Sequence, residues 1–163
     1  MKKLISVELR NFIEKNDALN LIKWLDDFEI VKYMNESKDV SKILTNILNN
    51  RQEALLTYYL NRSCIFHMVD YESDCVGFVS LIPSSNKQYE VVIAIGDKDI
   101  WGQKIGHFAL EKTILFAFNE LKCEKLIAKI HNENTRSIKL FENLGFKKEN
   151  FANKFLLYSL QKD

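Results

Sequence analysis

Val91 to Gly106 read VVIAIGDKDIWGQKIG, an apolar run followed by a polar turn and by glycine-containing residues that open a helix. The helix is predicted from apolar residues that recur on one face with a period of 3.6 residues, namely Leu110, Ile114, Ala117, Phe118 and Leu121. A strand that leads directly into a helix leaves the first backbone N–H groups of that helix unpaired and pointing outward. This arrangement predicts a site for an anion such as a phosphate group.

The glycines of this turn do not identify the ligand by themselves. Gly102 and Gly106 are separated by three residues, so the turn is poorer in glycine than a Walker A loop, and its spacing differs from G-x-G-x-x-G. An ordinary strand-to-helix turn, with two glycines placed for backbone geometry, is an equally good interpretation of this segment alone.

The chain has 163 residues, of which 47% are hydrophobic, and its formal net charge is +1. These values predict one compact domain, residues 1–163, without the strongly basic composition that is typical of nucleic-acid binding. Acids outnumber bases over residues 14–40, whereas bases outnumber acids over residues 119–163, so an anion would favour the second half. No apolar run reaches the roughly 18 residues of a membrane helix, and we expect a cytoplasmic protein with no nucleic-acid or membrane partner.

The cysteines predict free thiols. Three cysteines cannot all pair, and a hairpin turn at residues 71–74 would place Cys64 opposite Leu81 rather than opposite Cys75. Free thiols are typical of reducing compartments. No two cysteines have the spacing of metal ligands and the three histidines are scattered along the chain, so we expect no metal site.

The remaining patterns predict a mixed α/β domain with helices on both faces of a sheet. We expect strands at residues 4–10, 64–69, 75–82, 91–95, 125–131 and 155–160, and further helices at residues 17–25, 30–34, 40–60 and 135–144. Asn16 and Asp17 offer a cap for the first helix, and Asn134 offers a cap for the last. The polar residues 83–87 are expected to form a loop.

Residues 95–149 read IGDKDIWGQKIGHFALEKTILFAFNELKCEKLIAKIHNENTRSIKLFENLGFKKE. They closely resemble the GNAT acetyltransferase superfamily, particularly the branch of ribosomal-protein-alanine and spermidine N-acetyltransferases. The resemblance rests on the spacing of the phosphate loop, the run NTRS from Asn134 and the run Leu144-Gly145-Phe146. It implies a GNAT-like domain with a mostly antiparallel, twisted sheet that is splayed where acetyl-CoA binds.

The resemblance also implies which residues bind acetyl-CoA. Free backbone groups of Ile93, Ala94 and Ile95 would pair with the pantetheine arm as an added strand would. The backbone N–H groups that would hold the pyrophosphate belong to Gln103, Lys104, Ile105, Gly106 and His107.

The last helix would flank the coenzyme. Asn134 would contact the pantetheine, although it fits equally well as a plain helix cap. Phe141 would lie beside the coenzyme, at a position where many relatives have a tyrosine that protonates the departing thiolate. Phenylalanine cannot donate that proton. We interpret Gly145 as a left-handed residue that ends the helix and Phe146 as a residue that packs back on it.

Lys104 departs from the family pattern, because it stands at the first glycine of the phosphate loop. If that glycine provides a positive φ, lysine costs of order 1 kcal/mol of strain. If the glycine provides only space, the ammonium group can reach a phosphate. We favour the second interpretation.

The chemistry that the resemblance implies is attack of an amine on a thioester. A primary amine with a pKa near ~10 must first lose a proton at neutral pH. Glu90 is the leading candidate for the base, because it matches a family glutamate and shares strand parity with Val92 and Ala94. An exposed carboxylate without a role is the alternative. Ser137, Tyr158 or a water molecule would protonate the thiolate, although Ser137 also fits as an ordinary helix residue.

The acceptor is expected between residues 24–38 and residues 83–89. The acidic side chains of the first segment, Asp26, Asp27, Glu29 and Glu36, would attract a cationic amine such as a polyamine, an aminoglycoside or a basic peptide N-terminus. We therefore expect direct acetyl transfer from acetyl-CoA to a small cationic molecule or a peptide N-terminus, without a metal, by a monomer or a homodimer.

Two other functions fit the same sequence. A non-catalytic acyl-CoA-binding sensor or scaffold of this fold would explain why Lys104 and Phe141 depart from the family pattern. In such a protein Glu90→Gln would change nothing. A protein that binds another nucleotide through the same loop would show no preference for coenzyme A over ATP.

Overall fold

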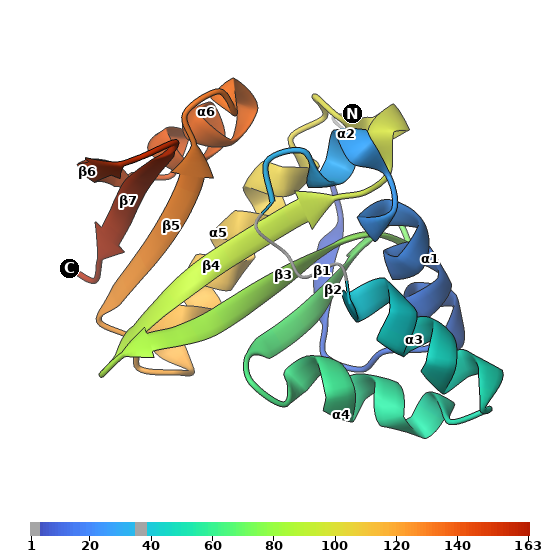
Figure 1. Ribbon diagram of the computed structural model, residues 1–163. Coiled ribbons are helices and arrows are strands. Elements are labelled where there is room, and N and C mark those ends of the chain that lie inside the picture. Colours follow the sequence, from blue (N-terminus) through green and yellow to red (C-terminus); the bar gives the residue numbers. More distant parts are fainter. Residues whose placement is uncertain (1–3, 35–38) are drawn as a thin grey trace.

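The computed structural model describes residues 4–34 and 39–163 (Figure 1). The strands of these residues form one sheet in the order β1-β2-β3-β4-β5-β7-β6. They are β1 Val7–Arg10, β2 Ile65–Tyr71, β3 Asp74–Ser85, β4 Gln88–Ile95, β5 Lys125–His131, β6 Lys147–Ala152 and β7 Phe155–Gln161. The helices are α1 Lys15–Leu25, α2 Phe28–Val31, α3 Asp39–Asn49, α4 Leu56–Asn61, α5 Ile105–Asn119 and α6 Thr135–Asn143, with short 3-10 turns at η1 Glu53–Leu55 and η2 Lys98–Ile100.

Helices cover both faces of the sheet, because alternate residues of each strand point to opposite sides. Phe66 and Met68 of β2 and Phe78 of β3 pack with buried residues of α1, α3 and α4. Val79 of β3 and Val91 of β4 pack on the other face with buried residues of α5. Figure 1 shows α1, α3 and α4 in front of the sheet and α5 behind it. The predicted α/β class, with a mostly antiparallel sheet, is confirmed.

The first elements differ in detail from the prediction. The first strand begins at Val7 rather than at residue 4. The N-cap of α1 is Glu14, not Asn16, and the backbone N–H of Glu14 donates to the Asp17 carboxylate at 2.7 Å. Asp17 is therefore the third residue of the helix in a capping box, in which an acidic side chain satisfies the backbone at the helix start.

The helix expected over residues 40–60 is divided. The first part, α3, ends at Asn49, and Arg51 follows with a φ of 53°. A left-handed residue cannot continue a right-handed helix, so the chain turns before η1 and α4. The helix expected at residues 30–34 is the short α2, which ends at Val31.

The hairpins also correct the prediction. A register shift between Val69 and Asp70 places Ile65, not Cys64, opposite Leu81, because a bulge adds one residue to one strand. The cysteines are nevertheless free, as predicted. Residues 83–85 continue β3, so only a tight turn at 86–87 separates it from β4.

β6 is not among the expected strands, because its sequence KKENFA has no alternation of apolar residues. It is an edge strand that pairs antiparallel with β7. An edge strand is held by its one neighbour and needs no apolar face of its own.

β4 and β5 are parallel and pair only at one end, where Gln88–Glu90 lie opposite Lys125–Ile127. β4 continues to Ile95 and β5 to His131 without further pairing between them, and the two strands diverge in Figure 1. The backbone of residues 91–95 thus has an edge without a partner strand on the β5 side. We call this divergence the fork.

Candidate active site

The fork opens into a cavity of 1410 Å³. Its walls are residues 90–95 of β4, the loop before α5, one side of α6, the end of β5 and the segment after α2. Pockets for small ligands usually measure about 300–1,000 Å³. The cavity therefore has room for an elongated ligand together with a second, smaller molecule.

The expected phosphate loop lies at one end of the cavity. Ile105, Gly106 and His107 form the first turn of α5 and line the cavity, and their backbone N–H groups have no acceptor from a preceding turn. Gln103 does not line the cavity, and its N–H donates to the carbonyl of Ile100. Of the five residues predicted to bind an anion, Ile105, Gly106 and His107 have unpaired backbone N–H groups at the cavity. Lys104 adds a cationic side chain to the same wall.

Lys104 is the N-cap of α5 and has a φ of 63° and a ψ of 17°. The backbone is therefore left-handed at this position. The interpretation that the family glycine provides only space is wrong here. Lys104 carries strain of order 1 kcal/mol, while its exposed side chain lines the cavity.

The open edge of β4 is partly occupied by a side chain. The indole N–H of Trp101 donates to the carbonyl oxygen of Ile95 at 2.7 Å. Ile93 and Ala94 line the cavity before this point. The edge that is left for an added strand is therefore residues 91–94. It ends one residue before Ile95, the last residue predicted to pair with the ligand.

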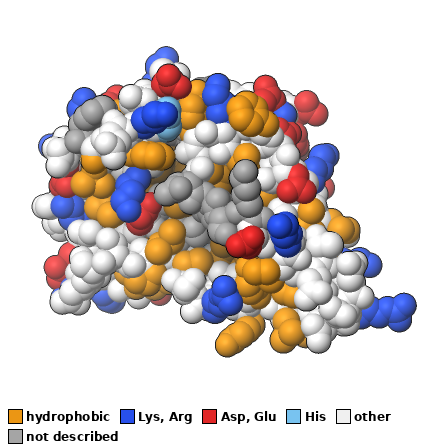
Figure 2. Space-filling view, viewed as in Figure 1, with side chains coloured by type: hydrophobic (Ala, Val, Ile, Leu, Met, Phe, Trp, Pro, Cys, Tyr) orange, Lys and Arg blue, Asp and Glu red, His pale blue; other side chains and the backbone are white. Residues whose placement is uncertain are grey.

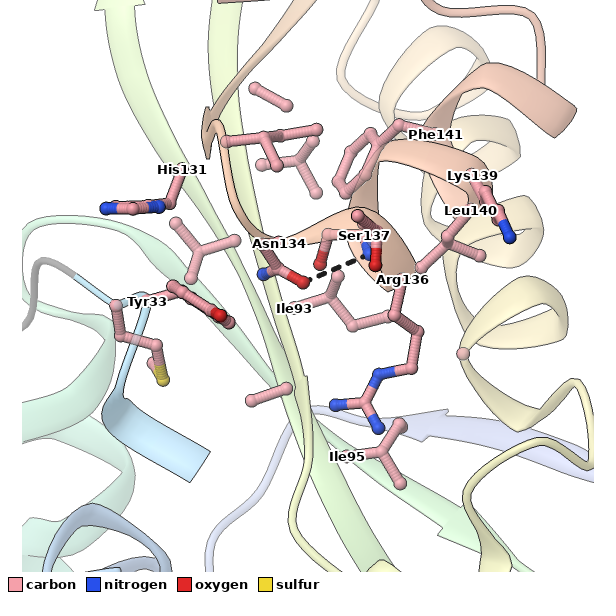
Figure 3. Close-up of a pocket in the computed structure, with 18 of the residues that line it drawn as sticks. Tyr33, Ile93, Ile95, His131, Asn134, Arg136, Ser137, Lys139, Leu140 and Phe141 are labelled. Carbon is pink, nitrogen blue, oxygen red and sulfur yellow. Dashed lines mark hydrogen bonds between the residues drawn. The ribbon is translucent and has the colours of Figure 1, made fainter. Parts of the chain in front are cut away.

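Asn134 and Ser137 meet at the start of α6 (Figure 3). The side-chain oxygen of Asn134 accepts a hydrogen bond from the backbone N–H of Ser137 at 3.2 Å. This confirms Asn134 as a helix cap. The cap uses only the side-chain oxygen, so the amide nitrogen can still donate to a ligand in the cavity. Ser137 also lines the cavity.

Phe141 is a buried wall of the cavity and meets Phe146 edge to face, with ring centroids 4.9 Å apart. Gly145 has a φ of 91°, which confirms the left-handed helix end. Tyr158 does not line the cavity, and its hydroxyl donates to Glu142 at 2.8 Å. Burial and the neighbouring carboxylate raise the pKa of Tyr158. The structure thus removes Tyr158 from the candidates for thiolate protonation.

Glu90 lies at the point where the fork opens. Its carboxylate pairs with the ammonium group of Lys129 at 3.2 Å, across the fork on β5. The Glu90 side chain is 20% exposed and lines the cavity, which argues against a carboxylate that simply faces solvent. The ion pair directs the carboxylate into the fork. No local sequence signal links Lys129 to Glu90, because the two residues lie on different strands.

An aromatic group lies at the other end of the cavity. The ring of Tyr33 is 5.0 Å from that of His131, which is 5.6 Å from that of Phe155. Figure 3 shows Tyr33, from the segment after α2, and His131, at the end of β5, on the same side of the cavity. Nδ1 of His131 accepts a hydrogen bond from the backbone N–H of Glu133 at 3.1 Å. No role is predicted for His131 from sequence, whereas Tyr33 lies within residues 24–38, the segment expected to enclose the acceptor.

The acidic residues predicted to bind the acceptor are largely engaged. Asp27 caps α2 and pairs with Lys98 at 2.7 Å, and Glu29 also pairs with Lys98. The hydrogen bond from Lys98 lowers the pKa of Asp27. Asp26 is exposed and does not line the cavity. Glu36 lies outside the described residues.

The charge on this side of the molecule is mixed. Figure 2 shows acidic and basic side chains interspersed over the visible face, with hydrophobic side chains between them. Within residues 4–34 and 39–163, no helix is long and apolar enough to cross a membrane. The same residues contain no group of three or more histidine, cysteine or acidic side chains arranged to hold a metal ion.

Comparison with known proteins agrees with this geometry. Residues 6–147 match the family model of the acetyltransferase (GNAT) domain. The chain is 32% identical over 140 residues to the uncharacterized N-acetyltransferase p20 of Bacillus licheniformis, a match that covers 84% of this chain and 77% of that protein.

Two solved structures share the fold. The Campylobacter jejuni N-acetyltransferase PseH in complex with acetyl coenzyme A has a TM-score of 0.69 at 16% identity, covering 98% of this chain and 100% of that one. The aminoglycoside acetyltransferase AAC(6')-Ib in complex with coenzyme A and kanamycin has a TM-score of 0.75 at 14% identity, covering 96% and 95%. From the family match, the relative and the shared fold, the chain belongs to the GNAT family and is an acetyl-CoA-dependent N-acetyltransferase.

Proposed function

We propose that this enzyme transfers acetyl directly from acetyl-CoA to a primary amine, without a covalent acyl-enzyme. The observation that carries the proposal is the fork, where an unpaired edge of β4 leads to the first turn of α5. The pantetheine arm would lie along residues 91–94 as an added strand. The pyrophosphate would lie at the N–H groups of Ile105, Gly106 and His107.

Glu90 would accept the proton of the attacking amine, directly or through a water molecule, because it is the carboxylate that lines the cavity where the fork opens. The amine nitrogen then forms a bond to the thioester carbon, and the carbon–sulfur bond breaks. Ser137 or a water molecule would return a proton to the thiolate, which is a good leaving group in its own right. The cavity holds both substrates together, which reduces the entropic cost of their encounter.

The acceptor in this proposal is a small cationic molecule or a peptide N-terminus, as expected from the ribosomal-protein-alanine and spermidine branch. Because Lys98 pairs with Asp27 and Glu29, a cationic acceptor would have to compete with Lys98 for these carboxylates. Tyr33 and His131 would provide an aromatic wall beside it. A cytoplasmic location, favoured by the free thiols, and a monomer or homodimer complete the proposal.

The test is acetyl transfer to a panel of polyamines, aminoglycosides, amino sugars and short peptides with varied N-termini. Aminoglycosides are included because the AAC(6')-Ib structure contains kanamycin. Products should be detected by mass, since the three free cysteines would react with a thiol dye. A product from one acceptor class would support the proposal and name that class. Saturable acetyl-CoA binding without any product would contradict amine transfer and favour a sensor.

A further inference from the structure

Trp101 and Arg136 meet across the phosphate end of the cavity. Trp101 belongs to the loop before α5, Arg136 belongs to the first turn of α6, and both line the cavity. The central carbon of the Arg136 guanidinium lies 3.6 Å from the centroid of the Trp101 ring. Figure 3 shows the side chain of Arg136 extending from α6 toward Ile95 of β4.

The Trp101 ring is itself held in place. Its indole N–H donates to the carbonyl oxygen of Ile95 at 2.7 Å, which ties the ring to the end of β4. The face of the ring is then available for stacking with the guanidinium. The stack therefore connects α6 to the loop before α5, two walls of the cavity that no strand pairing connects.

Arg136 has this stacking partner but no anionic one. In the described ranges no carboxylate lies within ion-pair distance of its guanidinium, and no hydrogen bond to it is found. A guanidinium stacks with its face, so its N–H groups remain free at the edge. Their planar fork matches two oxygens of a phosphate group. Lys104 and Lys139 add two more cations to the lining of the same cavity.

We propose that Arg136 binds a phosphate group of coenzyme A and that Trp101 positions it for this purpose. The assignment rests on the coenzyme site proposed above. Arg136 would contact the ligand, whereas Trp101 acts through Arg136. This pair would make the enzyme select coenzyme A thioesters over acyl-pantetheines that lack the nucleotide phosphates.

Calorimetric titration of the full chain with coenzyme A and with dephospho-coenzyme A tests the proposal. The second compound lacks the 3′-phosphate but keeps the pyrophosphate. Arg136→Ala should weaken coenzyme A binding about 10- to 100-fold, the range expected when a hydrogen-bonded charge is removed. Arg136→Lys should restore only part of this loss, because a lysine keeps the charge but not the planar fork.

The two ligands distinguish the phosphates. A loss confined to coenzyme A assigns Arg136 to the 3′-phosphate, whereas an equal loss for both ligands assigns it to the pyrophosphate. Trp101→Phe should weaken binding in the wild type but add little in the Arg136→Ala background, because a positioning residue has no effect once its partner is gone.

Lys139→Ala is the matched control, because it removes another cation of α6 that does not stack on Trp101. It should weaken binding only a few-fold.

Equal affinity of wild type and Arg136→Ala for both ligands would overturn the assignment and leave the coenzyme site standing. No binding of coenzyme A by the wild type would overturn the site and the assignment together. Thermal melts of each variant establish that the variants are folded.

Discussion

Arg10 and Arg136 both stack on an aromatic ring, yet their surroundings are opposite. Arg10 lies 4.9 Å from the centroid of the Phe12 ring and donates five hydrogen bonds, to both oxygens of Asp17, both oxygens of Asp70 and the carbonyl of Phe12. Asp17 is only 3% exposed. Every donor of this guanidinium is used, so the network joins β1, α1 and β2 and leaves nothing for a ligand.

Arg136 stacks more closely on its ring but has no hydrogen-bonding partner in the part of the chain that the structure describes. It stands beside an unpaired strand edge and the first turn of a helix. Removing one partner of a buried, paired charge destabilises a fold, because it leaves the other charge with less compensation. Charges that are unpaired beside a cavity are available for binding. The same residue type thus serves the fold in one half of the molecule and the site in the other.

The carboxylates repeat this contrast. Asp17 is held by Arg10 and by the backbone of Glu14, whereas Glu90 has one ion pair, with Lys129, whose side chain is 57% exposed. Replacing Asp17 should therefore affect stability, and replacing Glu90 should affect the reaction. The following four experiments test this division, from the largest expected effect to the smallest.

Glu90→Gln should lower kcat about 10²- to 10⁴-fold near neutral pH, because the amide keeps the shape of the side chain but cannot accept the proton of the amine. Its melting temperature should stay close to that of the wild type. Initial rates with the acceptor found in the panel and a thermal melt measure both effects. Glu111→Gln, an exposed change on the outer side of α5, is the control. An unchanged kcat would rule out Glu90 as the base.

Asp17→Asn should lower the free energy of unfolding by about 1.5–3 kcal/mol, because it removes the charge that accepts two hydrogen bonds from the half-buried Arg10 and leaves Asp70 as its remaining carboxylate partner. The rate per folded molecule should change little. Urea unfolding measures the stability, and Asp26→Asn, at the exposed end of the same helix, is the control. A loss below about 1 kcal/mol would show that the network contributes no more than a surface ion pair.

The same network should make stability depend on pH. Burial alone would raise the pKa of Asp17, but hydrogen bonds from Arg10 and the Glu14 backbone outweigh it and lower the pKa below its ordinary value. An unfolded aspartate titrates near ~3.9, so the stabilisation is complete above that pH and is lost as pH falls through the lower folded-state pKa.

Urea titrations of wild type and Asp17→Asn at decreasing pH measure this effect. The stability difference between them should be constant near neutral pH and shrink below about pH 4. A difference that did not depend on pH would mean that the charge of Asp17 contributes nothing and that only its shape matters.

Lys104→Gly should raise the free energy of unfolding by about 1 kcal/mol, because glycine adopts a positive φ without strain. Lys122→Gly is a matched control, since Lys122 has a φ of 54° and does not line the cavity. Both variants should gain similar stability in urea unfolding. Only Lys104→Gly should alter the KM for acetyl-CoA. An equal KM in wild type and both variants would show that Lys104 does not contact the coenzyme.

The local features of the site could be predicted from consecutive residues. The strand that enters α5, the cap at Asn134 and the left-handed Gly145 depend on interactions within a few positions, and sequence spacing records such interactions directly. Sequence also identified Lys104 as unusual. Its positive φ became evident only from the fold. Sequence could not show whether the family glycine provides space or a left-handed backbone, because this depends on how the loop enters the helix.

Contacts between distant segments could not be predicted in this way. The sequence by itself determined the helical period of α5, the cap at Asn134 and the strand-to-helix turn at residues 91–106, because each is encoded within one segment. Only the tertiary structure decided that Lys98 pairs with Asp27, that Tyr33 meets His131 and that Arg136 stacks on Trp101. Periodicity shows which face of a helix or strand is buried or charged. Which segment packs against that face depends on the order of the strands and on the fork between β4 and β5.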